Sequence, residues 1–297
     1  WIRTKAVGFG FGDGYPAELT GSTALVGNFG AADGNLYVVS DTALTVLNGS
    51  AKEMFSARHS YNDPAVSEAS GRYLLYNAGG TGYRVETSSG TEISGTSDSS
   101  ITTGGICDSG KFALAVQPSD YASELRVYNK NGSLQYKYSF ADSYITAVAL
   151  NTDGTKAAVA STITHAGTLI SRITVLDMSE TEPIAEYESD GNLIFAVQWN
   201  RSGRVPAIGD TETLVSDTSY NFTPYAYDGR TVTAYTRIPS GAVVSVSNYA
   251  YGGDSTLLIF RDSAEPVKSD LSGRAVWLSA AGNKVAALLS SSVVSTD

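Results

Sequence analysis

The chain has 297 residues, of which 42% are hydrophobic and only 17% are charged, and it contains 30 Gly and 8 Pro. This composition excludes a disordered or low-complexity chain, and the length allows one large all-β domain with a sizeable core. The net charge of −10 disfavours contact with phosphate backbones, so we expect no nucleic-acid partner. A single cysteine, Cys107, excludes an intrachain disulfide and a cysteine-cluster metal site.

Tight turns that end in glycine recur between short apolar runs along the whole chain. Glycine supplies the positive φ that such hairpin turns need. The turn glycines follow one another at spacings of 37 to 49 residues, and they are Gly34, Gly71, Gly110, Gly154, Gly203, Gly241 and Gly282. A period near 40 residues is typical of a protein in which each repeat forms one small structural unit.

A second pattern, of alternating apolar residues that end in Asp or Asn, lies downstream of the turns. It is clearest at residues 44–48, 125–129 and 173–177, and weaker at 213–217 and 258–262. Alternation with a period of two predicts a strand with one buried face, and the final Asp or Asn can bond its own backbone and begin a turn. Residues 145–187 contain four such short runs, which predicts one four-stranded antiparallel unit. No helix of any length is predicted.

We therefore predict an all-β fold, a single seven-bladed β-propeller domain over residues 1–297 with four-stranded antiparallel blades. The last repeat, at residues 275–297, lacks an outer strand. We expect residues 2–19, or part of them, to pair with it and close the ring, since closure protects sheet edges. The period is similar to that of WD repeats, although their Gly-His and Trp-Asp dipeptides are absent. A β-sandwich, the alternative, would show no sustained period.

Few residues indicate a catalytic or cofactor site. Cys107 has no histidine nearby in the sequence, and we interpret it as a small buried side chain. His59 and His165 are the only histidines and fall in the first and fourth repeats, so we interpret both as solvated loop residues rather than as metal ligands. The glycine-rich residues 8–14 lack the spacing of a dinucleotide loop. We predict no catalytic residue, no metal and no cofactor.

Carboxylates are plentiful in the predicted connections. They include Asp13, Asp63, Asp120, Asp142, Asp190 and Asp254. Propeller glycosidases and lyases use pairs of such groups as acid and base, but the sequence gives no pairing and most of these residues also suit turns. None matches the spacing of a calcium-binding loop.

Four long connections are expected on one face of the propeller, at residues 58–64, 117–123, 161–171 and 248–254. Loops on a rigid scaffold commonly carry binding sites, although tolerated insertions would look the same. The candidate binding residues are Tyr61, Asp120, Tyr121, His165, Tyr249, Tyr251 and Asp254. The other tyrosines of repeats five and six, such as Tyr225 and Tyr227, are expected to pack between blades.

Several short segments carry a family resemblance, and they are residues 13–19, 62–66, 79–84, 121–125 and 207–210. Through them the chain resembles the uncharacterised, membrane-anchored β-propeller proteins of gut Gram-positive bacteria, a domain-of-unknown-function family. The resemblance implies an amino-terminal membrane helix before Trp1 and a propeller outside the cell. That family has no assigned activity, so it assigns no role to any residue.

The leading functional hypothesis is a non-catalytic extracellular binding or scaffold module that recognises a protein, peptide or glycan. One alternative is a glycan-processing hydrolase or lyase that uses carboxylates of the long-loop face. Another is a structural subunit of a membrane-tethered assembly. We expect a monomer that meets the membrane only through the anchor segment.

Overall fold

The computed structural model describes residues 12–19, 23–32 and 34–296. These residues form 27 strands and no helix, which confirms the all-β prediction, and so none of them belongs to a helix able to cross a membrane. The chain divides into two compact units, Trp1–Ser139 and Phe140–Asp297, and each is described by itself.

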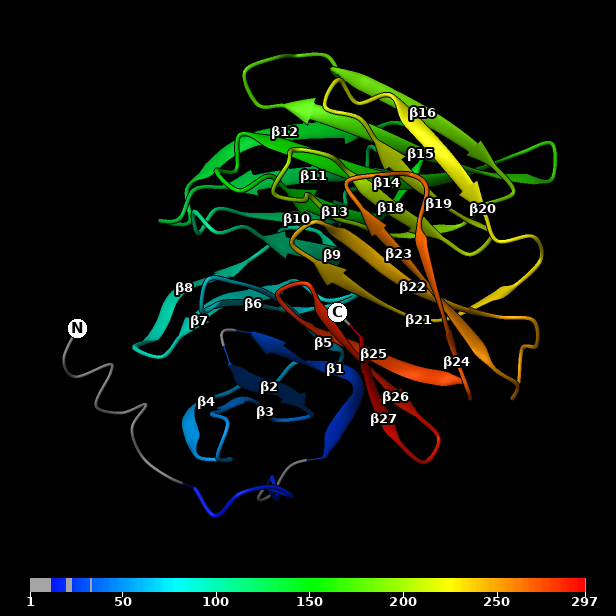
Figure 1. Ribbon diagram of the computed structural model, residues 1–297. Coiled ribbons are helices and arrows are strands. Elements are labelled where there is room, and N and C mark those ends of the chain that lie inside the picture. Colours follow the sequence, from blue (N-terminus) through cyan, green and yellow to red (C-terminus); the bar gives the residue numbers. More distant parts are fainter. Residues whose placement is uncertain (1–11, 20–22, 33, 297) are drawn as a thin grey trace. The chain divides into compact units, whose positions relative to one another are not determined.

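Unit one holds three four-stranded antiparallel sheets, in each of which the strands lie side by side in chain order (Figure 1). Sheet one contains β1 (Ala24–Ala32), β2 (Asn35–Ser40), β3 (Ala43–Leu47) and β4 (Glu53–Arg58). Sheet two contains β5 (Pro64–Ala69), β6 (Arg72–Asn77), β7 (Gly82–Thr87) and β8 (Gly90–Thr96). Sheet three contains β9 (Ser100–Ile106), β10 (Phe112–Gln117), β11 (Ser123–Tyr128) and β12 (Leu134–Phe140).

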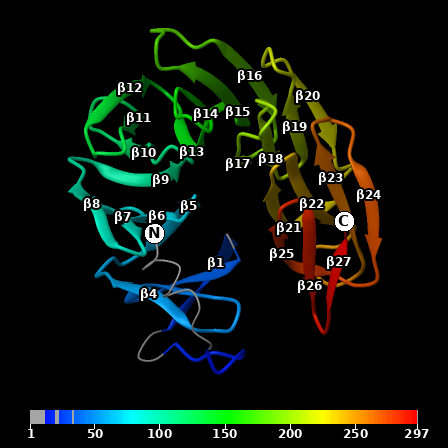
Figure 2. The ribbon, with the colours of Figure 1, turned by 60° about the vertical axis from the view of Figure 1, so that its left-hand side comes forward.

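Unit two holds four further antiparallel sheets built in the same way (Figure 2). Sheet four contains β13 (Tyr144–Leu150), β14 (Lys156–His165), β15 (Thr168–Asp177) and β16 (Ala185–Asp190). Sheet five contains β17 (Ile194–Val197), β18 (Pro206–Gly209), β19 (Glu212–Ser216) and β20 (Phe222–Ala226). Sheet six contains β21 (Thr231–Ile238), β22 (Gly241–Ser247), β23 (Ser255–Arg261) and β24 (Val267–Leu271). Sheet seven contains β25 (Ala275–Ala281), β26 (Lys284–Leu289) and β27 (Val293–Thr296).

The first hairpin of every sheet turns at the predicted glycine. All seven turn glycines have positive φ, between +61° and +155°. At Gly71 an added Cβ would meet no atom within 4 Å, so the turn requires glycine for its backbone conformation and not for space. The repeat pattern in the sequence therefore predicted where each sheet begins.

Three of the five Asp and Asn residues that end the third strands form the expected local turns, whereas Asp262 Oδ1 accepts from Asn200 and Ser202 of the β17–β18 connection in sheet five. Asn48 Oδ1 accepts from the Ser50 backbone N–H at 3.0 Å, Asp177 Oδ1 from that of Ser179 at 3.0 Å, and Asp217 Oδ1 from that of Ser219 at 2.8 Å. Each carboxylate or amide satisfies backbone donors that the end of the strand leaves open.

The core of each unit lies between consecutive sheets. Tyr73 and Leu75 of β6 pack against Leu44 of β3, and Leu74 on the other face of β6 packs with Phe112 of β10. Burying one such side chain contributes about 1.5–3 kcal/mol relative to its exposure. In unit two the same role falls to Ile173, Ile194 and Leu214, to Val244, Leu258 and Phe260, and to Leu257, Leu278 and Val285.

Residues 161–171 are not the loop that we predicted. β14 and β15 continue pairing as far as His165 and Thr168, and the turn is only Ala166 and Gly167, whose φ angles are +48° and +83°. Positive φ at both central residues is typical of the tight type I′ hairpin. The flanking Thr and Ile residues favour a strand, and this outweighed the polarity that suggested a loop.

Sheet seven has three strands among the described residues, as expected for a last repeat without an outer strand. The described part of the amino-terminal segment contacts sheet one: the Gly12 N–H donates to Ser50 Oγ at 3.0 Å and Tyr15 Oη donates to the Asn48 carbonyl at 3.0 Å. Residues 2–11 lie outside the described residues, so ring closure by this segment stays a prediction.

Candidate functional site

The candidate residues chosen from the sequence are divided between the two units. Tyr61, Asp120 and Tyr121 belong to unit one, and His165, Tyr249, Tyr251 and Asp254 belong to unit two. Asp120 is exposed and accepts from Ser119 Oγ at 3.0 Å, while Tyr121 beside it is 46% exposed. His165 is exposed at the tip of the β14–β15 hairpin.

The connection from β22 to β23, residues 248–254, presents two tyrosines to solvent. Tyr249 is 66% exposed and Tyr251 is 94% exposed. Arg274 Nη1 donates to the Tyr249 carbonyl at 2.9 Å, and Ser247 Oγ donates to the Asp254 carbonyl at 2.8 Å. The backbone of the connection is therefore held at both ends while the Tyr251 ring projects from its tip.

Of the other tyrosines of repeats five and six, Tyr225 and Tyr227 pack inside unit two, as predicted, whereas Tyr235 of β21 is 44% exposed, against the prediction. Tyr227 is fully buried and its hydroxyl lies 2.6 Å from Thr213 Oγ1, and burial raises the pKa of the Tyr227 phenol. Tyr225 meets Phe260 edge-on at 5.7 Å between ring centres. Tyr249 and Tyr251 are exposed in the long loop, as predicted.

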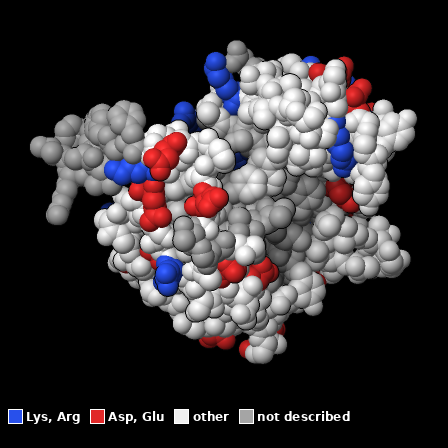
Figure 3. Space-filling model, turned by 90° about the horizontal axis from the view of Figure 1, so that it is seen from below, with Lys and Arg blue, Asp and Glu red and all other residues white. Residues whose placement is uncertain are grey.

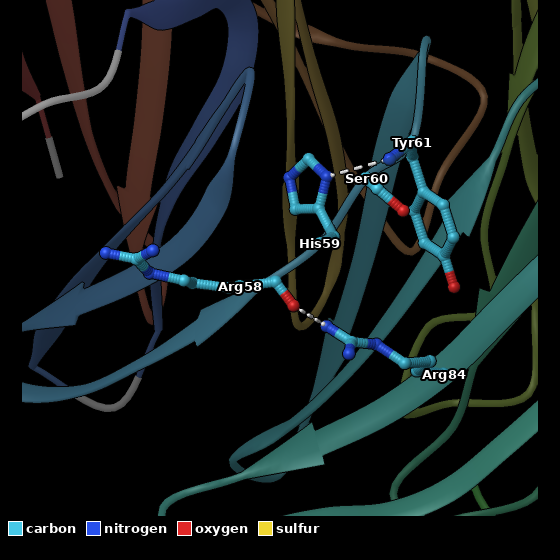
Figure 4. Close-up of a pocket in the computed structure, with 5 residues that line it drawn as sticks. All are labelled: Arg58, His59, Ser60, Tyr61 and Arg84. Carbon is cyan, nitrogen blue, oxygen red and sulfur yellow. Dashed lines mark hydrogen bonds between the residues drawn. The ribbon is translucent and has the colours of Figure 1, made fainter.

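Unit one contains an open pocket of about 270 Å³ between the β4–β5 connection and β7. Arg58, His59, Ser60, Tyr61 and Arg84 line it (Figure 4). Figure 4 shows the His59 and Tyr61 rings on one side and the Arg84 guanidinium below them, facing the carbonyl of Arg58, whose own side chain points away.

His59 is a structural residue of this pocket. Its Nδ1 accepts the Tyr61 backbone N–H at 3.2 Å, so Nε2 carries the ring proton and donates it to the Ser40 carbonyl at 3.1 Å. Burial lowers the pKa of His59 despite the bond to Ser40, and the nearby Arg84 charge adds to the lowering. The interpretation of His59 as a solvated loop residue was wrong, because both ring nitrogens are bonded to backbone.

The Tyr61 ring stacks on His59 and occupies space that the glycine at the start of β7 leaves open. Its ring lies 5.5 Å from that of His59 with an interplanar angle of 25°. A Cβ on Gly82 would lie 2.7 Å from Tyr61 Cε1, so the first residue of β7 must lack a side chain for this ring to fit. Burial raises the pKa of the Tyr61 phenol.

Arg84 and Glu86 of β7 are functional candidates that the sequence reasoning missed. Arg84 Nη2 donates to the Arg58 carbonyl at 2.6 Å, and Arg84 Nε lies 3.0 Å from Glu86 Oε1. Glu86 is 1% exposed, and its other oxygen accepts from Thr91 Oγ1 at 2.8 Å. The sequence signal that could have identified them is Arg-x-Glu within a predicted strand. Residues two apart lie on the same face of a strand, and two charged side chains on a buried face need partners.

Arg126 of β11 is buried and is bonded to two acids. Arg126 Nε donates to Glu124 Oε1 at 2.6 Å, and Nη1 donates to Asp98 Oδ1 at 2.7 Å. Lys137 Nζ also lies 3.1 Å from Glu124. The sequence reasoning missed this cluster too.

The two carboxyls of this cluster are held ionised. The hydrogen bond from Arg126 lowers the pKa of Asp98. Burial alone would raise the pKa of Glu124, but the hydrogen bonds and charges of Arg126 and Lys137 outweigh it and lower that pKa as well. One guanidinium bridges the two carboxyls. A general acid needs a raised pKa, whereas the pKa values of both carboxyls are lowered, so the pair fits a structural role better than a catalytic one.

Cys107 is 4% exposed, as predicted for a small buried side chain. Burial raises the pKa of its thiol, with the Sγ atom 3.2 Å from Ser109 Oγ and 3.4 Å from the Lys111 carbonyl. Across residues 12–19, 23–32 and 34–296, no group of three or more His, Cys, Asp or Glu side chains could hold a metal ion.

The model of a family of unknown function, DUF5711, matches residues 19–226. The chain belongs to this family. The match includes the pocket of unit one, whereas Tyr249 and Tyr251 of this DUF5711 protein lie beyond it. A comparison with curated protein sequences gives no match.

Solved structures similar to this DUF5711 chain are β-propellers at low sequence identity. The β-propeller domain of Cps50 (Swd1) from Myceliophteria thermophila has a TM-score of 0.64 and 10% identity, covering 93% of this chain and 97% of that one. Kuenenia stuttgartiensis hydrazine synthase gives 0.62 and 10%, covering 94% and 99%. The Dos1 propeller gives 0.61 and 12%, covering 88% and 74%. They show the fold alone, which confirms a seven-bladed β-propeller with the seven sheets as blades.

Proposed function

We propose that this DUF5711 propeller is a non-catalytic binding module, and that the β22–β23 connection is its main contact surface. The observation that carries the proposal is the exposure of Tyr249 and Tyr251, 66% and 94%, on a connection whose backbone is held by Arg274 and Ser247. A rigid loop with projecting tyrosines loses little entropy on binding, because each ring has only two rotatable side-chain bonds.

Tyrosine rings suit a protein, peptide or glycan partner, since the ring face can stack while the hydroxyl forms hydrogen bonds. Figure 3 shows one face of the molecule, on which groups of Asp and Glu and of Lys and Arg lie among mostly uncharged residues. Uncharged polar and aromatic surface is compatible with recognition that depends on stacking and hydrogen bonds more than on charge.

The best candidates for catalysis are engaged in structural contacts instead. Both ring nitrogens of His59 are bonded to backbone, the Cys107 thiol is buried, and the Glu124 and Asp98 carboxyls are tied to Arg126. These contacts favour the binding hypothesis over the hydrolase or lyase alternative.

We also propose that the propeller works outside the cell as a monomer, tethered by a segment that precedes Trp1. The single cysteine fits an exported protein of a Gram-positive bacterium as well as a cytosolic protein, so this placement rests on the family resemblance. Protease treatment of intact cells that express the full-length protein tests this placement: we expect the propeller to be digested, and protection until the cells are lysed would contradict it.

An array of glycans, peptidoglycan fragments and peptides tests the main proposal, with binding and turnover both measured. We expect binding without turnover, weakened about tenfold or more by Tyr251→Ala. Tyr144→Ala is the matched control, because Tyr144 of β13 is also 53% exposed in the same unit but lies outside the connection. Turnover of any ligand, or equal losses in the two variants, would contradict the proposal.

A further inference from the structure

Arg84 and Arg126 occupy the same position in neighbouring sheets of unit one. Arg84 of β7 pairs with Leu75, which lies four residues after the turn glycine Gly71. Arg126 of β11 pairs with Leu114, which lies four residues after the turn glycine Gly110. Because the registers correspond, each guanidinium extends toward the connection that enters its own sheet from the sheet before.

In sheet three that connection supplies an acid. Asp98, between β8 and β9, binds Arg126 Nη1 at 2.7 Å, and Ser97 Oγ lies 3.4 Å from the same nitrogen. The Asp98 side chain is 75% exposed, whereas that of Arg126 is 8% exposed. A carboxylate can therefore reach this buried guanidinium from solvent.

In sheet two the corresponding connection, residues 59–63, contains Asp63, but among the described residues Asp63 forms no ion pair with Arg84. Arg84 bonds instead to the carbonyl of Arg58, the last residue of β4, and the pocket lies beside it. Arg84, Ser60 and Tyr61 line this space. Within the described part of the chain, Arg84 Nη1, Ser60 Oγ and Tyr61 Oη form no hydrogen bond. These groups can therefore donate hydrogen bonds to a ligand, and the stacked rings of His59 and Tyr61 lie beside them.

We propose that this pocket binds a carboxylate of a residue-sized ligand, which would take the place on Arg84 that Asp98 takes on Arg126. A volume of about 270 Å³ fits one sugar or amino-acid residue. A guanidinium and a carboxylate match in geometry, and the hydroxyls of Ser60 and Tyr61 can add bonds. The His59 and Tyr61 rings form an apolar wall for the rest of the ligand.

Glu86 does not prevent a ligand carboxylate from binding. Glu86 Oε1 lies 3.0 Å from Arg84 Nε, and Glu86 follows Arg84 by two residues. Glu124 precedes Arg126 by two residues and accepts a hydrogen bond from Arg126 Nε at 2.6 Å. Arg126 nevertheless holds Asp98 through Nη1. A guanidinium flanked by one buried carboxylate thus already accepts a second in this protein.

The test is titration of the protein with D-glucuronate and with N-acetylglycine, against the neutral D-glucose and N-acetylglycinamide, by ligand-observed NMR. We expect at least one acid to bind with a Kd on the order of 1 mM, and its neutral counterpart to bind at least about tenfold more weakly. Binding of glucuronate alone would identify an acidic sugar, of N-acetylglycine alone a peptide carboxyl terminus, and of both the carboxylate itself. If neither acid binds more tightly than its neutral counterpart, the proposal is wrong.

Two variants locate the site. Arg84→Gln should weaken binding about tenfold or more, while Arg237→Gln, at an exposed arginine of unit two, should not change it. Ser60→Asp would place an internal carboxylate beside Arg84, and we expect it to abolish ligand binding and raise the Tm. The second variant keeps the test decisive if Arg84→Gln fails to fold. Full binding by Ser60→Asp would overturn the proposal, and Tyr251→Ala should leave this site intact.

Discussion

Arg126 and Arg84 share one register in adjacent sheets but differ in how their charge is satisfied. Arg126 is enclosed by Glu124 and Asp98, and its side chain is 8% exposed. Arg84 has the carboxylate of Glu86 and one carbonyl, and its side chain is 22% exposed beside a pocket. The comparison shows that the same position in a repeat can stabilise the fold or leave donors for a ligand, depending on one residue in the preceding connection.

The largest expected effect is at the enclosed arginine. Arg126→Met should lower the free energy of unfolding by about 3 kcal/mol, because it leaves the buried Glu124 with only Lys137 as a cationic partner. Denaturant unfolding measures the loss. Arg172→Met is the matched control: Arg172 also lies on the third strand of its sheet, but its partner Glu188 is 53% exposed, so less than about 1 kcal/mol should be lost. Equal losses would show that Arg126 is no more structural than a surface pair.

Low pH should reduce the stability of the fold in two separate pH ranges, one set by His59 and the other by Glu124 and Asp98. The folded pKa of His59 is below 6.5, so as the pH falls below 6.5 the unfolded chain takes up a proton that the folded chain does not, and stability declines by at most about 1.4 kcal/mol per pH unit. The lowered carboxyl pKa values of Glu124 and Asp98 give stability that is present above about pH 4.5 and is lost as the pH falls through their folded pKa values.

Unfolding measured from pH 7 to pH 3 separates these contributions. His59→Gln should flatten the decline between pH 6.5 and 5, and Arg126→Met should flatten the decline at lower pH. A pH profile that His59→Gln leaves unchanged would mean that burial does not hold His59 in its neutral form.

The smallest expected effect on stability comes from removing the Asp98 carboxylate from the Arg126 cluster. Asp98→Ala removes an exposed carboxylate and should cost less than about 1 kcal/mol. It should also free Nη1 of Arg126, so added acetate should raise the Tm of this variant more than that of the unmodified protein. Asp108→Ala is the control, since Asp108 accepts only from the exposed Ser70. If acetate raises the Tm of both variants equally, the view that Arg84 and Arg126 can bind a carboxylate in the same way would be contradicted.

Much of the fold was predictable because its signals are local. A turn that needs positive φ restricts the residue to glycine, and so the repeats could be read from Gly34 to Gly282. The exposed Tyr251 was also predictable, since a long loop between strands places it on the surface. The hairpin at residues 161–171 was missed because its Thr and Ser residues suit both a polar loop and an edge of a sheet.

The arginine sites were not predictable, because they depend on contacts between separate repeats. The alternating strand pattern specifies apolar residues at Leu125 and Val127 and places no requirement on Arg126 between them. Only the fold brings Asp98, 28 residues earlier, to Arg126. Arg84 likewise meets the Arg58 carbonyl 26 residues before it. No period or motif in the sequence records which connection brings its acid to the arginine: Asp98 contacts Arg126, whereas Arg84 bonds to the Arg58 carbonyl although the β4–β5 connection contains Asp63.

Cys107 offers a way to watch unit one open and close. It is the only thiol in the chain, and it lies at the turn between β9 and β10 with 4% of its surface exposed. A thiol reagent must therefore wait for that turn to open before it can react, and its rate reports the local opening equilibrium. The unmodified protein thus carries its own probe, and labelling rates measured with and without a bound acid would show whether the ligand steadies this unit.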